Sequence, residues 1–483
     1  MTAPAARPRV AIADVHHVHI VAIAGVAMAA LAGMLKQRSL HVTGSDEAIY
    51  PPMSTLLERL GIAVMSGYGA ANLTPRPDLV VIGNKVSRDN PEVQAVLAAG
   101  LPYVSLPEAL AELFIAGKQS LVVAGTHGKT TSTAMLGWVL ECAGQDPTIL
   151  VGGESLDLHG NFKLGNGPHF VIEGDEYDTA FFDKGPKFLH YRPSAAILTA
   201  VEFDHADIYA DLDAVKAAFR RFVALLPAGA PLAVAQAFPH ALEIAAGAPQ
   251  TRCMRFGIGA VEAEWTARDL RDGPDGLQFR VWHRERDEGG LRLKVPGAMN
   301  AANALGVYAL TRELGLSHAA IADGLARFSG VARRQELAGE RRGVTVIDDF
   351  AHHPTAVAGT LAALRERYRG RRLWAVFEPR SNTSRRRVFQ RDYVEALARA
   401  DRVIIGGVFQ KATDVVAAQE LFSPAQLVAD LSARGVAAEA IDDSAAIAAT
   451  LAVAAQPGDV VVLMSNGSFG GLRPRLLAAL GPA

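Results

Sequence analysis

Cysteine is scarce in this chain of 483 residues, which contains only Cys142 and Cys253. No CxxC pair and no Cys/His spacing of a zinc site occurs, which argues against a disulfide framework and a structural metal. A surplus of positive charge is also missing, because 48 Lys and Arg nearly balance 50 Asp and Glu. Nucleic acid is therefore not expected as the main ligand. The few cysteines fit a reducing, cytoplasmic location.

A hydrophobic run long enough to cross a membrane is missing as well. Residues 20–35 carry no charge, but a bilayer needs about 20 apolar residues, and Gly25 and Gly33 interrupt the run. Asp14 and three histidines precede it, where a secretion signal would have basic residues. We expect a strand, a turn and a helix here, and no membrane partner.

The order of apolar segments predicts an α/β protein with three domains. Short β-branched runs alternate with Ala- and Leu-rich helical patterns, as in open parallel sheets. Folded domains usually hold roughly 100–200 residues, so this chain is too long for one core. We predict a loose tail at residues 1–17 and domains at 18–117, 118–330 and 331–483. The expected strands are 19–23, 40–43, 79–82, 121–124, 170–173, 195–199, 277–281, 291–295, 344–347, 373–377, 402–405 and 460–463.

The strongest motif is an apolar strand that runs into the glycine-rich loop GTHGKT at residues 125–130. Glycines let backbone N–H groups converge on phosphates, and the start of the next helix adds positive potential. Lys129 would reach the β- and γ-phosphates, and the Thr130 hydroxyl could bind Mg²⁺. The full Walker pattern is not met, because Val123 occupies the position of its first glycine. An ordinary turn with a surface lysine is the alternative.

Several carboxylates follow the expected strand at residues 170–173: Glu173, Asp175, Glu176 and Asp178. Charges directly after a buried strand lie at the edge of the sheet where α/β proteins bind ligands. We therefore favour metal binding over a solvated acidic loop.

These segments resemble the Mur ligase family of ATP-dependent amide ligases. GTHGKTT at 125–131 resembles its variant phosphate loop, VIEGDEYD at 171–178 its acidic motif, and DHAD at 204–207 its DHxD segment. The resemblance implies Lys129, Glu173 and His205 as catalytic residues, with two Mg²⁺ ions held by Thr130, Glu173 and His205. The chain departs from the family at Ala200, where relatives carry Asn, and Lys216 does not align with the lysine that some members carbamylate.

More motifs follow in the family's order. PGAMNAAN at 296–303 resembles GxHNxxN with Met299 in place of His, GVARRQE at 330–336 resembles GxxRRxE, and DDFAHHP at 348–354 resembles DDYAHHP. The two asparagines could instead cap or bridge a helical turn. The resemblance implies an ATP site made of Gly125, Thr126, His127, Gly128, Lys129, Thr130, Thr131, Asn300, Asn303, Arg334, Asp349 and His352.

The turn after the first expected strand is filled with small residues, where family members that bind UDP-N-acetylmuramate carry several glycines. Only Gly25 remains of that set. A dinucleotide fingerprint needs GxGxxG, so a nicotinamide oxidoreductase is disfavoured. An acidic residue at the end of the second strand often meets a ribose. The resemblance implies UDP-sugar binding by Gly25, Ser45, Asp46 and Asn84.

Residues 50–58, 377–383 and 464–471 resemble the branch of the family that adds a tripeptide in peptidoglycan recycling. Such a peptide needs more cationic and amide donors than alanine does, and Arg380, Ser381, Asn382 and Asn466 are the peptide-binding candidates. Plain turns are the alternative interpretation of these segments.

The resemblance implies Rossmann-like N- and C-terminal domains around a P-loop ATPase-like middle. It also implies a reaction that joins L-Ala-γ-D-Glu-meso-diaminopimelate to the lactyl carboxylate of UDP-N-acetylmuramate. ATP would yield ADP and phosphate through an acyl phosphate. The alternatives are the L-alanine-adding branch and a P-loop sensor of cell-wall precursors that joins nothing. The sequence does not decide between monomer and dimer.

Overall fold

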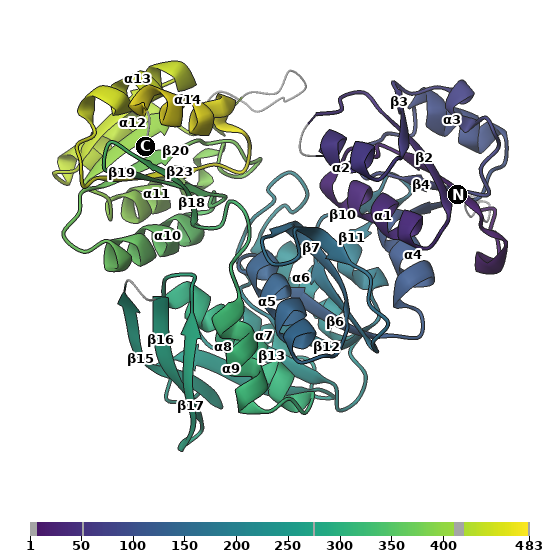
Figure 1. Ribbon diagram of the computed structural model, residues 1–483, viewed down its shortest axis with the longest axis horizontal. Helices are drawn as coiled ribbons and strands as arrows, with labels where there is room; N and C mark the ends of the chain where they lie inside the picture. Colours follow the sequence, from purple (N-terminus) through teal and green to yellow (C-terminus); the bar gives the residue numbers. More distant parts are fainter. Residues whose placement is uncertain (1–6, 51–52, 274–275, 410–419, 482–483) are drawn as a thin grey trace.

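The computed structural model describes residues 7–50, 53–273, 276–409 and 420–481. Three large sheets follow one another along the chain, with helices packed around each (Figure 1). The sheets of the first and last parts lie on opposite sides above the middle part in this view. The predicted α/β fold with three parts is confirmed.

The N-terminal sheet is entirely parallel, with the order β3-β2-β1-β4-β5. Its central strands are β-branched and buried, which suits a sheet covered on both faces. Its elements are β1 (His17–Val21), α1 (Val26–Gln37), β2 (His41–Asp46), α2 (Met53–Arg59), β3 (Ala63–Ser66), β4 (Leu79–Ile82), α3 (Pro91–Ala98), β5 (Tyr103–Ser105) and α4 (Leu106–Leu110).

The start of the chain differs from the predicted loose tail. The Arg7 guanidinium donates to both carboxylate oxygens of Glu108, at 2.9 and 2.5 Å. A 3-10 turn spans Ile12–Asp14, and β1 already begins at His17. A contact between residues 101 positions apart leaves no local signal in the sequence. Residues 1–6 of the predicted tail lie outside the described residues.

The middle part holds a ten-stranded sheet with the order β17-β16-β15-β14-β13-β12-β6-β9-β7-β8. Its centre is parallel, and antiparallel pairs extend it at both ends. Its strands are β6 (Gln119–Ala124), β7 (Thr148–Ser155), β8 (Gly160–Lys163), β9 (His169–Gly174), β12 (Pro193–Leu198), β13 (Pro231–Ala235), β14 (Arg252–Ile258), β15 (Trp265–Gly273), β16 (Gly276–His283) and β17 (Arg286–Leu293). Its helices are α5 (Lys129–Cys142), α6 (Leu212–Val223), α7 (Pro239–Ala246), α8 (Ala298–Glu313) and α9 (His318–Arg327), and a separate hairpin is formed by β10 (Asp178–Ala180) and β11 (Asp183–Pro186).

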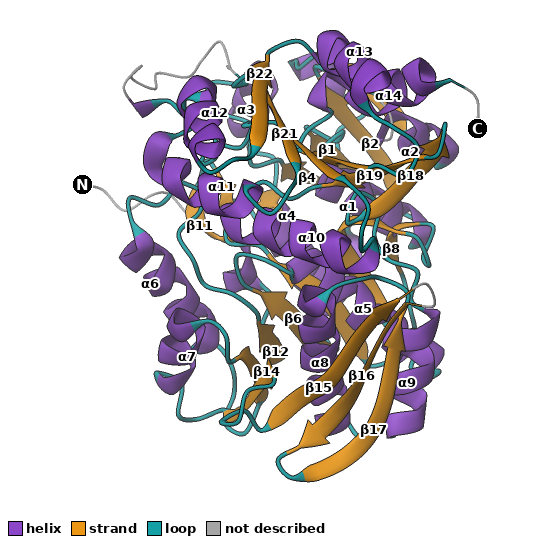
Figure 2. Ribbon diagram, turned by 90° about the vertical axis from the view of Figure 1, so that its left-hand side faces the viewer, coloured by secondary structure: helices purple, strands orange, loops and turns teal. Residues whose placement is uncertain are grey.

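The C-terminal sheet has the order β18-β19-β23-β20-β21-β22 and is parallel except for the β18–β19 pair. Figure 2 shows α10 lying between this sheet and the tops of the middle strands. Its elements are β18 (Glu336–Arg341), β19 (Val344–Asp349), α10 (Pro354–Arg367), β20 (Leu373–Phe377), α11 (Gln390–Leu397), β21 (Arg402–Gly406), α12 (Pro424–Ala433), β22 (Ala437–Ile441), α13 (Ser444–Ala454), β23 (Val460–Met464) and α14 (Leu472–Leu480).

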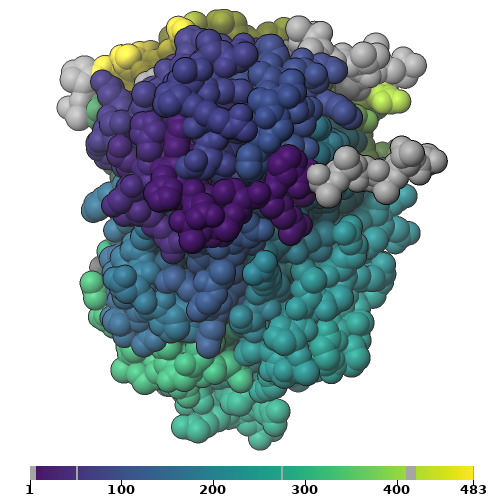
Figure 3. All heavy atoms as spheres, turned by 90° about the vertical axis from the view of Figure 1, so that its right-hand side faces the viewer, coloured from purple at the N-terminus to yellow at the C-terminus, as the bar shows by residue number. Residues whose placement is uncertain are grey.

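Figure 3 shows the N-terminal part lying directly on the middle part, whose sheet has β8 as an edge strand. The Asn161 side chain on β8 donates to the Val26 carbonyl at the start of α1, at 3.2 Å. Within the described ranges, no helix combines the length and the apolarity that a membrane span requires.

Candidate active site

The loop between β6 and α5 needs its glycines. Gly125 and Gly128 adopt φ of 135° and 80°, which side chains rarely tolerate. A Cβ on Gly125 would lie 2.2 Å from the Thr199 hydroxyl, and one on Gly128 would lie 2.6 Å from Asn303 Oδ1. The loop therefore packs tightly against β12 and α8, with α5 beginning at Lys129.

Lys129 lies at the carboxyl edge of the middle sheet, largely buried. Its Nζ contacts the Gly125 carbonyl at 2.6 Å and the Glu176 carboxylate at 2.8 Å. Burial alone would lower the pKa of this amine, but Glu176, Glu173 and Asp175 raise it above its ordinary value. The lysine therefore keeps its charge at the place where a phosphate would enter.

Thr130 and Glu173 form a pair of oxygen donors beside Lys129. The Thr130 hydroxyl donates to Glu173 Oε1 at 3.0 Å, and the other carboxylate oxygen accepts from the Gly152 amide at 2.9 Å. Burial raises the pKa of Glu173, an effect that Lys129 opposes. A hydroxyl and a carboxylate are the hard ligands that Mg²⁺ prefers, so the donor set fits that ion.

His205 is joined to this group through Glu176, which the sequence analysis named only as one of four carboxylates in the acidic cluster. The His205 Nε2 lies 2.9 Å from Glu176 Oε1, and the same carboxylate holds Lys129. Burial lowers the pKa of His205, but the bond to Glu176 raises it above its ordinary value overall. The order of motifs had placed Glu176 in the acidic cluster, yet nothing in the sequence distinguished it from its neighbours.

The two asparagines of α8 lie beside the phosphate loop. Asn300 donates to the Pro296 carbonyl at 2.8 Å, and Asn303 donates to Asn300 Oδ1 at 3.3 Å. Asn303 also faces Gly128. Asn300 therefore caps no N–H at the start of α8, and the two asparagines bridge a helical turn, with Asn303 positioned at the loop itself.

Both departures from the family pattern fall inside packed structure. Ala200 is buried, and its carbonyl accepts from the Thr126 amide at 2.7 Å. The Met299 sulfur lies against Gly359 of α10. Lys216, which the sequence left unassigned, pairs with Glu243 at 2.6 Å.

The C-terminal part adds Arg334 to the site. Its guanidinium donates to the Thr130 hydroxyl at 3.3 Å and lies 4.8 Å from the centre of the Phe350 ring. The Asp349 carboxylate is hydrogen-bonded to the backbone, because it accepts from the amides of Gln335 and Ala351, both at 2.7 Å. His352 lies 3.8 Å from Asp204. Of the three C-terminal residues predicted for the ATP site, Arg334 is thus the one that contacts the Lys129–Thr130 segment directly.

The peptide-binding candidates follow β20 and β23, which are neighbours in the C-terminal sheet. Arg380 stacks on Phe409, 3.8 Å from the ring centre, and packs against Gly467. Ser381 bonds to the Ser384 hydroxyl at 2.9 Å, and Asn382 donates to Asp207 at 2.6 Å. Asn466 Oδ1 is buried and has no hydrogen-bond partner among the described residues.

The N-terminal candidates are more dispersed. Gly25 precedes α1, and Asp46 accepts from the Ala24 amide at 2.9 Å, so both lie at the turn. Asn84 is exposed just after β4. The Ser45 hydroxyl is buried and donates to Glu92 at 2.8 Å, because Glu92 gathers several donors there. The Ser45 hydroxyl is thus engaged with Glu92 in this structure, and UDP-sugar binding by Ser45 stays a prediction. Pro51 and Pro52 of segment 50–58 lie outside the described residues.

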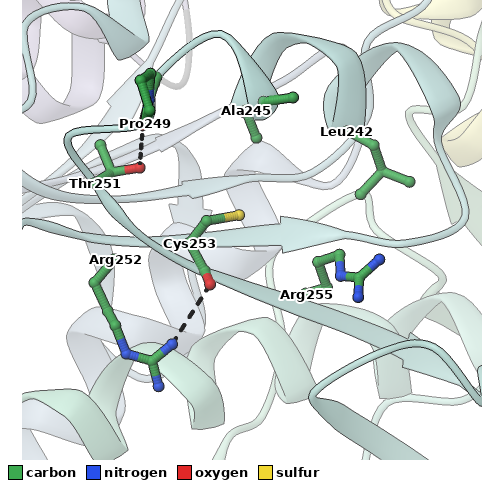
Figure 4. Close-up of a pocket in the computed structure, with 9 residues that line it drawn as sticks. Leu242, Ala245, Pro249, Thr251, Arg252, Cys253 and Arg255 are labelled. Carbon is green, nitrogen blue, oxygen red and sulfur yellow. Dashed lines mark hydrogen bonds between the residues drawn. The ribbon is translucent and has the colours of Figure 1, made fainter.

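An open hollow of about 680 Å³ lies elsewhere, between α7 and β14 (Figure 4). Leu242 and Ala245 of α7 line one side, and Cys253 and Arg255 line the other. It contains no residue of the phosphate loop, so its size does not identify the site. The carboxyl edge around Lys129 is the better candidate, because charges and glycines converge there.

Family models match most of the chain. Residues 17–118 match the Mur ligase family catalytic domain, 123–311 the Mur ligase middle domain, and 333–467 the Mur ligase glutamate ligase domain.

Similar proteins span nearly the whole chain. The UDP-N-acetylmuramate--L-alanyl-gamma-D-glutamyl-meso-2,6-diaminoheptandioate ligase of Escherichia coli K12 is 40% identical, over 96% of this chain and 98% of its own length. A UDP-N-acetylmuramate--L-alanine ligase of Arthrobacter is 39% identical over 86% of each chain.

The crystal structure of a murein peptide ligase from Psychrobacter arcticus superposes with a TM-score of 0.72 at 35% identity, covering 97% of this chain and 99% of that one. The geometry at Lys129 and this agreement along the whole chain lead to one conclusion: the protein belongs to the Mur ligase family of ATP-dependent ligases.

Proposed function

We propose that this chain joins the lactyl carboxylate of UDP-N-acetylmuramate to the amine of L-Ala-γ-D-Glu-meso-diaminopimelate, with ATP converted into ADP and phosphate. The observation that carries the proposal is the convergence of Lys129, Thr130, Glu173 and His205 at one sheet edge. The tripeptide acceptor is favoured by the E. coli relative, whose name gives that peptide. Asn466 supports it further, because its free oxygen faces no protein donor.

In this reaction the sugar carboxylate attacks the γ-phosphorus, and the bond from phosphorus to the ADP oxygen breaks. The peptide amine then attacks the acyl carbon of the resulting acyl phosphate and releases inorganic phosphate. Lys129 would leave Glu176 and hold the transferring phosphoryl group, while Arg334 would add positive charge from the C-terminal side. Mg²⁺ bound at Thr130 and Glu173, with a second ion near His205, would neutralise phosphate charge. The protein therefore supplies alignment and charge and needs no covalent nucleophile.

The test is a competition between L-alanine and the tripeptide as acceptors, with ATP, Mg²⁺ and UDP-N-acetylmuramate present and the UDP-linked product identified by mass. We expect the tripeptide product to dominate. Preference for alanine would favour the second candidate, an L-alanine ligase, which the Arthrobacter relative at 39% identity keeps open. ATP binding with neither product would favour a sensor that joins nothing.

We also propose that the enzyme acts in the cytoplasm, where ATP and UDP-sugars are available. Gel filtration with light scattering would decide between a monomer and a dimer.

A further inference from the structure

The segment at residues 202–207 lies between the phosphate loop and the C-terminal part of the chain. Five of its six residues contact the C-terminal side. Glu202 accepts from the Thr355 hydroxyl at 3.1 Å, and the Phe203 carbonyl lies 3.2 Å from His353 Nε2. The remaining contacts are Asp204 with His352 at 3.8 Å, Ala206 with Thr383 at 3.2 Å and Asp207 with Asn382 at 2.6 Å. His205 alone turns the other way, toward Glu176.

The opposite side of Glu202 holds the phosphate loop. Its amide donates to the Thr126 hydroxyl at 2.9 Å, and its second carboxylate oxygen lies 2.9 Å from His127 Nε2. Thr126 and His127 precede Lys129 by three and two residues. One side chain therefore contacts both the loop that would hold ATP and the first turn of α10, where Thr355 lies.

The ligand atoms of His127, Glu202 and His353 lie within 4.8 Å of one another, a spacing that a metal ion could use. His353 already has protein partners, whereas His127 Nε2 and Glu202 Oε2 lie 2.9 Å apart and have no further partner among the described residues. His353 Nδ1 accepts from the Thr355 amide at 3.3 Å, and its Nε2 contacts the Phe203 carbonyl, so both ring nitrogens have partners. The cluster is better explained as a link between two parts of the chain than as a metal site.

We infer that Glu202 is a positioning residue through which docking of the C-terminal domain sets the geometry of the phosphate loop. The inference deepens the proposed function and rests on it. The Thr355–Glu202–His127 contacts would hold the loop in its reactive arrangement only while α10 is docked. Phosphoryl transfer before closure, which would expose the acyl phosphate to water, would thereby be disfavoured.

The first test uses a matched pair at Thr355, which lies outside the ATP and peptide sites. Thr355→Val removes the hydroxyl but keeps the shape, whereas Thr355→Ser keeps the hydroxyl. We expect Val to lower kcat about tenfold, the rate equivalent of one hydrogen bond to a charged group, with KM for ATP nearly unchanged. Ser should retain most of the activity. Equal rates for Val and Ser would overturn the inference.

A double-variant cycle tests whether the contacts form one link. Glu202→Gln should lower kcat by at least about tenfold, and adding Thr355→Val should cause little further loss. Losses that multiply would mean independent roles and would overturn the inference. Glu262→Gln, which removes an exposed carboxylate, is the control for charge alone and should behave as the unaltered enzyme.

Hydrogen exchange gives a readout that needs no acceptor. With Mg²⁺ and a non-hydrolysable ATP analogue, we expect the amides of residues 350–357 to gain protection in the unaltered chain but not in Glu202→Gln or Thr355→Val. Equal protection in all three, or none in the unaltered chain, would refute the coupling. Failure to ligate either acceptor would refute the proposed function alone, so the two failures are distinguishable.

Discussion

The chain builds the same strand–turn–helix unit twice, once between β1 and α1 and once between β6 and α5. The second turn uses Gly125 and Gly128 at positive φ and ends in Lys129, with carboxylates nearby. The first has Ala22 at φ 65° and Gly25 at an ordinary φ of −66°, with Asp46 as its nearest charged partner. Both turns lead into the positive start of a helix. They differ in their glycine conformations and in the positive charge of Lys129, and both differences favour the second turn as the place for a triphosphate.

Removal of the Lys129 charge should have the largest effect of the changes considered, because only the second turn carries a lysine. Lys129→Ala is expected to lower turnover at least about a hundredfold, the scale of one lost electrostatic contact in the transition state. The fold should remain, because the lysine packs no core. Steady-state kinetics and circular dichroism would measure both, with the exposed Lys36→Ala as control. Turnover near that of the control would contradict the assignment of this loop to ATP.

The second-largest difference should come from replacing a glycine in each turn, because only the second turn needs a positive φ. Gly128→Ala forces an alanine into φ 80° against Asn303, which costs about 1–2 kcal/mol of stability from the backbone alone. Gly25→Ala has an allowed φ, and its Cβ would meet Met28 at an ordinary 3.6 Å. Its stability should be unchanged, while KM for the UDP-sugar rises about tenfold, because the added Cβ would hold the phosphate away from the backbone N–H groups and weaken one hydrogen bond. Thermal unfolding and initial rates measure these effects.

An unchanged KM in Gly25→Ala would mean that no phosphate approaches the first turn closely. A loss of stability in that variant would instead show that Gly25 serves the fold.

The smallest effect concerns His353, whose tilted ring lies over the second turn with its centre 4.4 Å from that of the His127 ring. Burial, with the neighbouring His127, lowers the pKa of His353 to about 3. The unfolded chain therefore binds more protons between that value and about 6.5, and stability falls as the pH drops through this range. From pH 7.5 to 5.5 the loss attributable to this group is about 1.4 kcal/mol.

His353→Asn keeps a capping side chain without a titrating ring. Thermal unfolding at the two pH values should show a weaker pH dependence in this variant than in the unaltered chain. An equal pH dependence of stability in the variant and the unaltered chain would show that His353 is not the group responsible.

Much of the fold follows from the sequence because buried parallel strands are continuous apolar runs. The strands predicted at 79–82 and 373–377 are confirmed as β4 and β20. Others were not predicted: β22 reads AAEAI, whose alanines favour a helix, and β14 alternates arginines with buried residues. Pairing with a neighbouring strand decides such segments, and a local pattern does not contain that information.

The candidate site likewise contains residues that the sequence predicts and residues that only the structure reveals. The order of motifs selected Lys129, Thr130 and Glu173, which the structure brings together. It named Glu176 only within the acidic cluster and did not name Glu202, because their roles depend on partners 29 and 75 residues or more away along the chain. It also could not show that Ser45 turns inward, since Glu92 reaches it only in the folded sheet.

Helix α5 runs from Lys129 to Cys142, so a natural thiol lies at the far end of the phosphate-loop helix, about 20 Å away. Burial raises the pKa of both thiols, but Cys142 is half-buried whereas Cys253 on β14 is exposed. The ratio of their alkylation rates would therefore report how often the end of this helix opens, with Cys253 as an internal reference. Local opening of this helix end can therefore be measured with the two natural cysteines, and no reporter group has to be introduced.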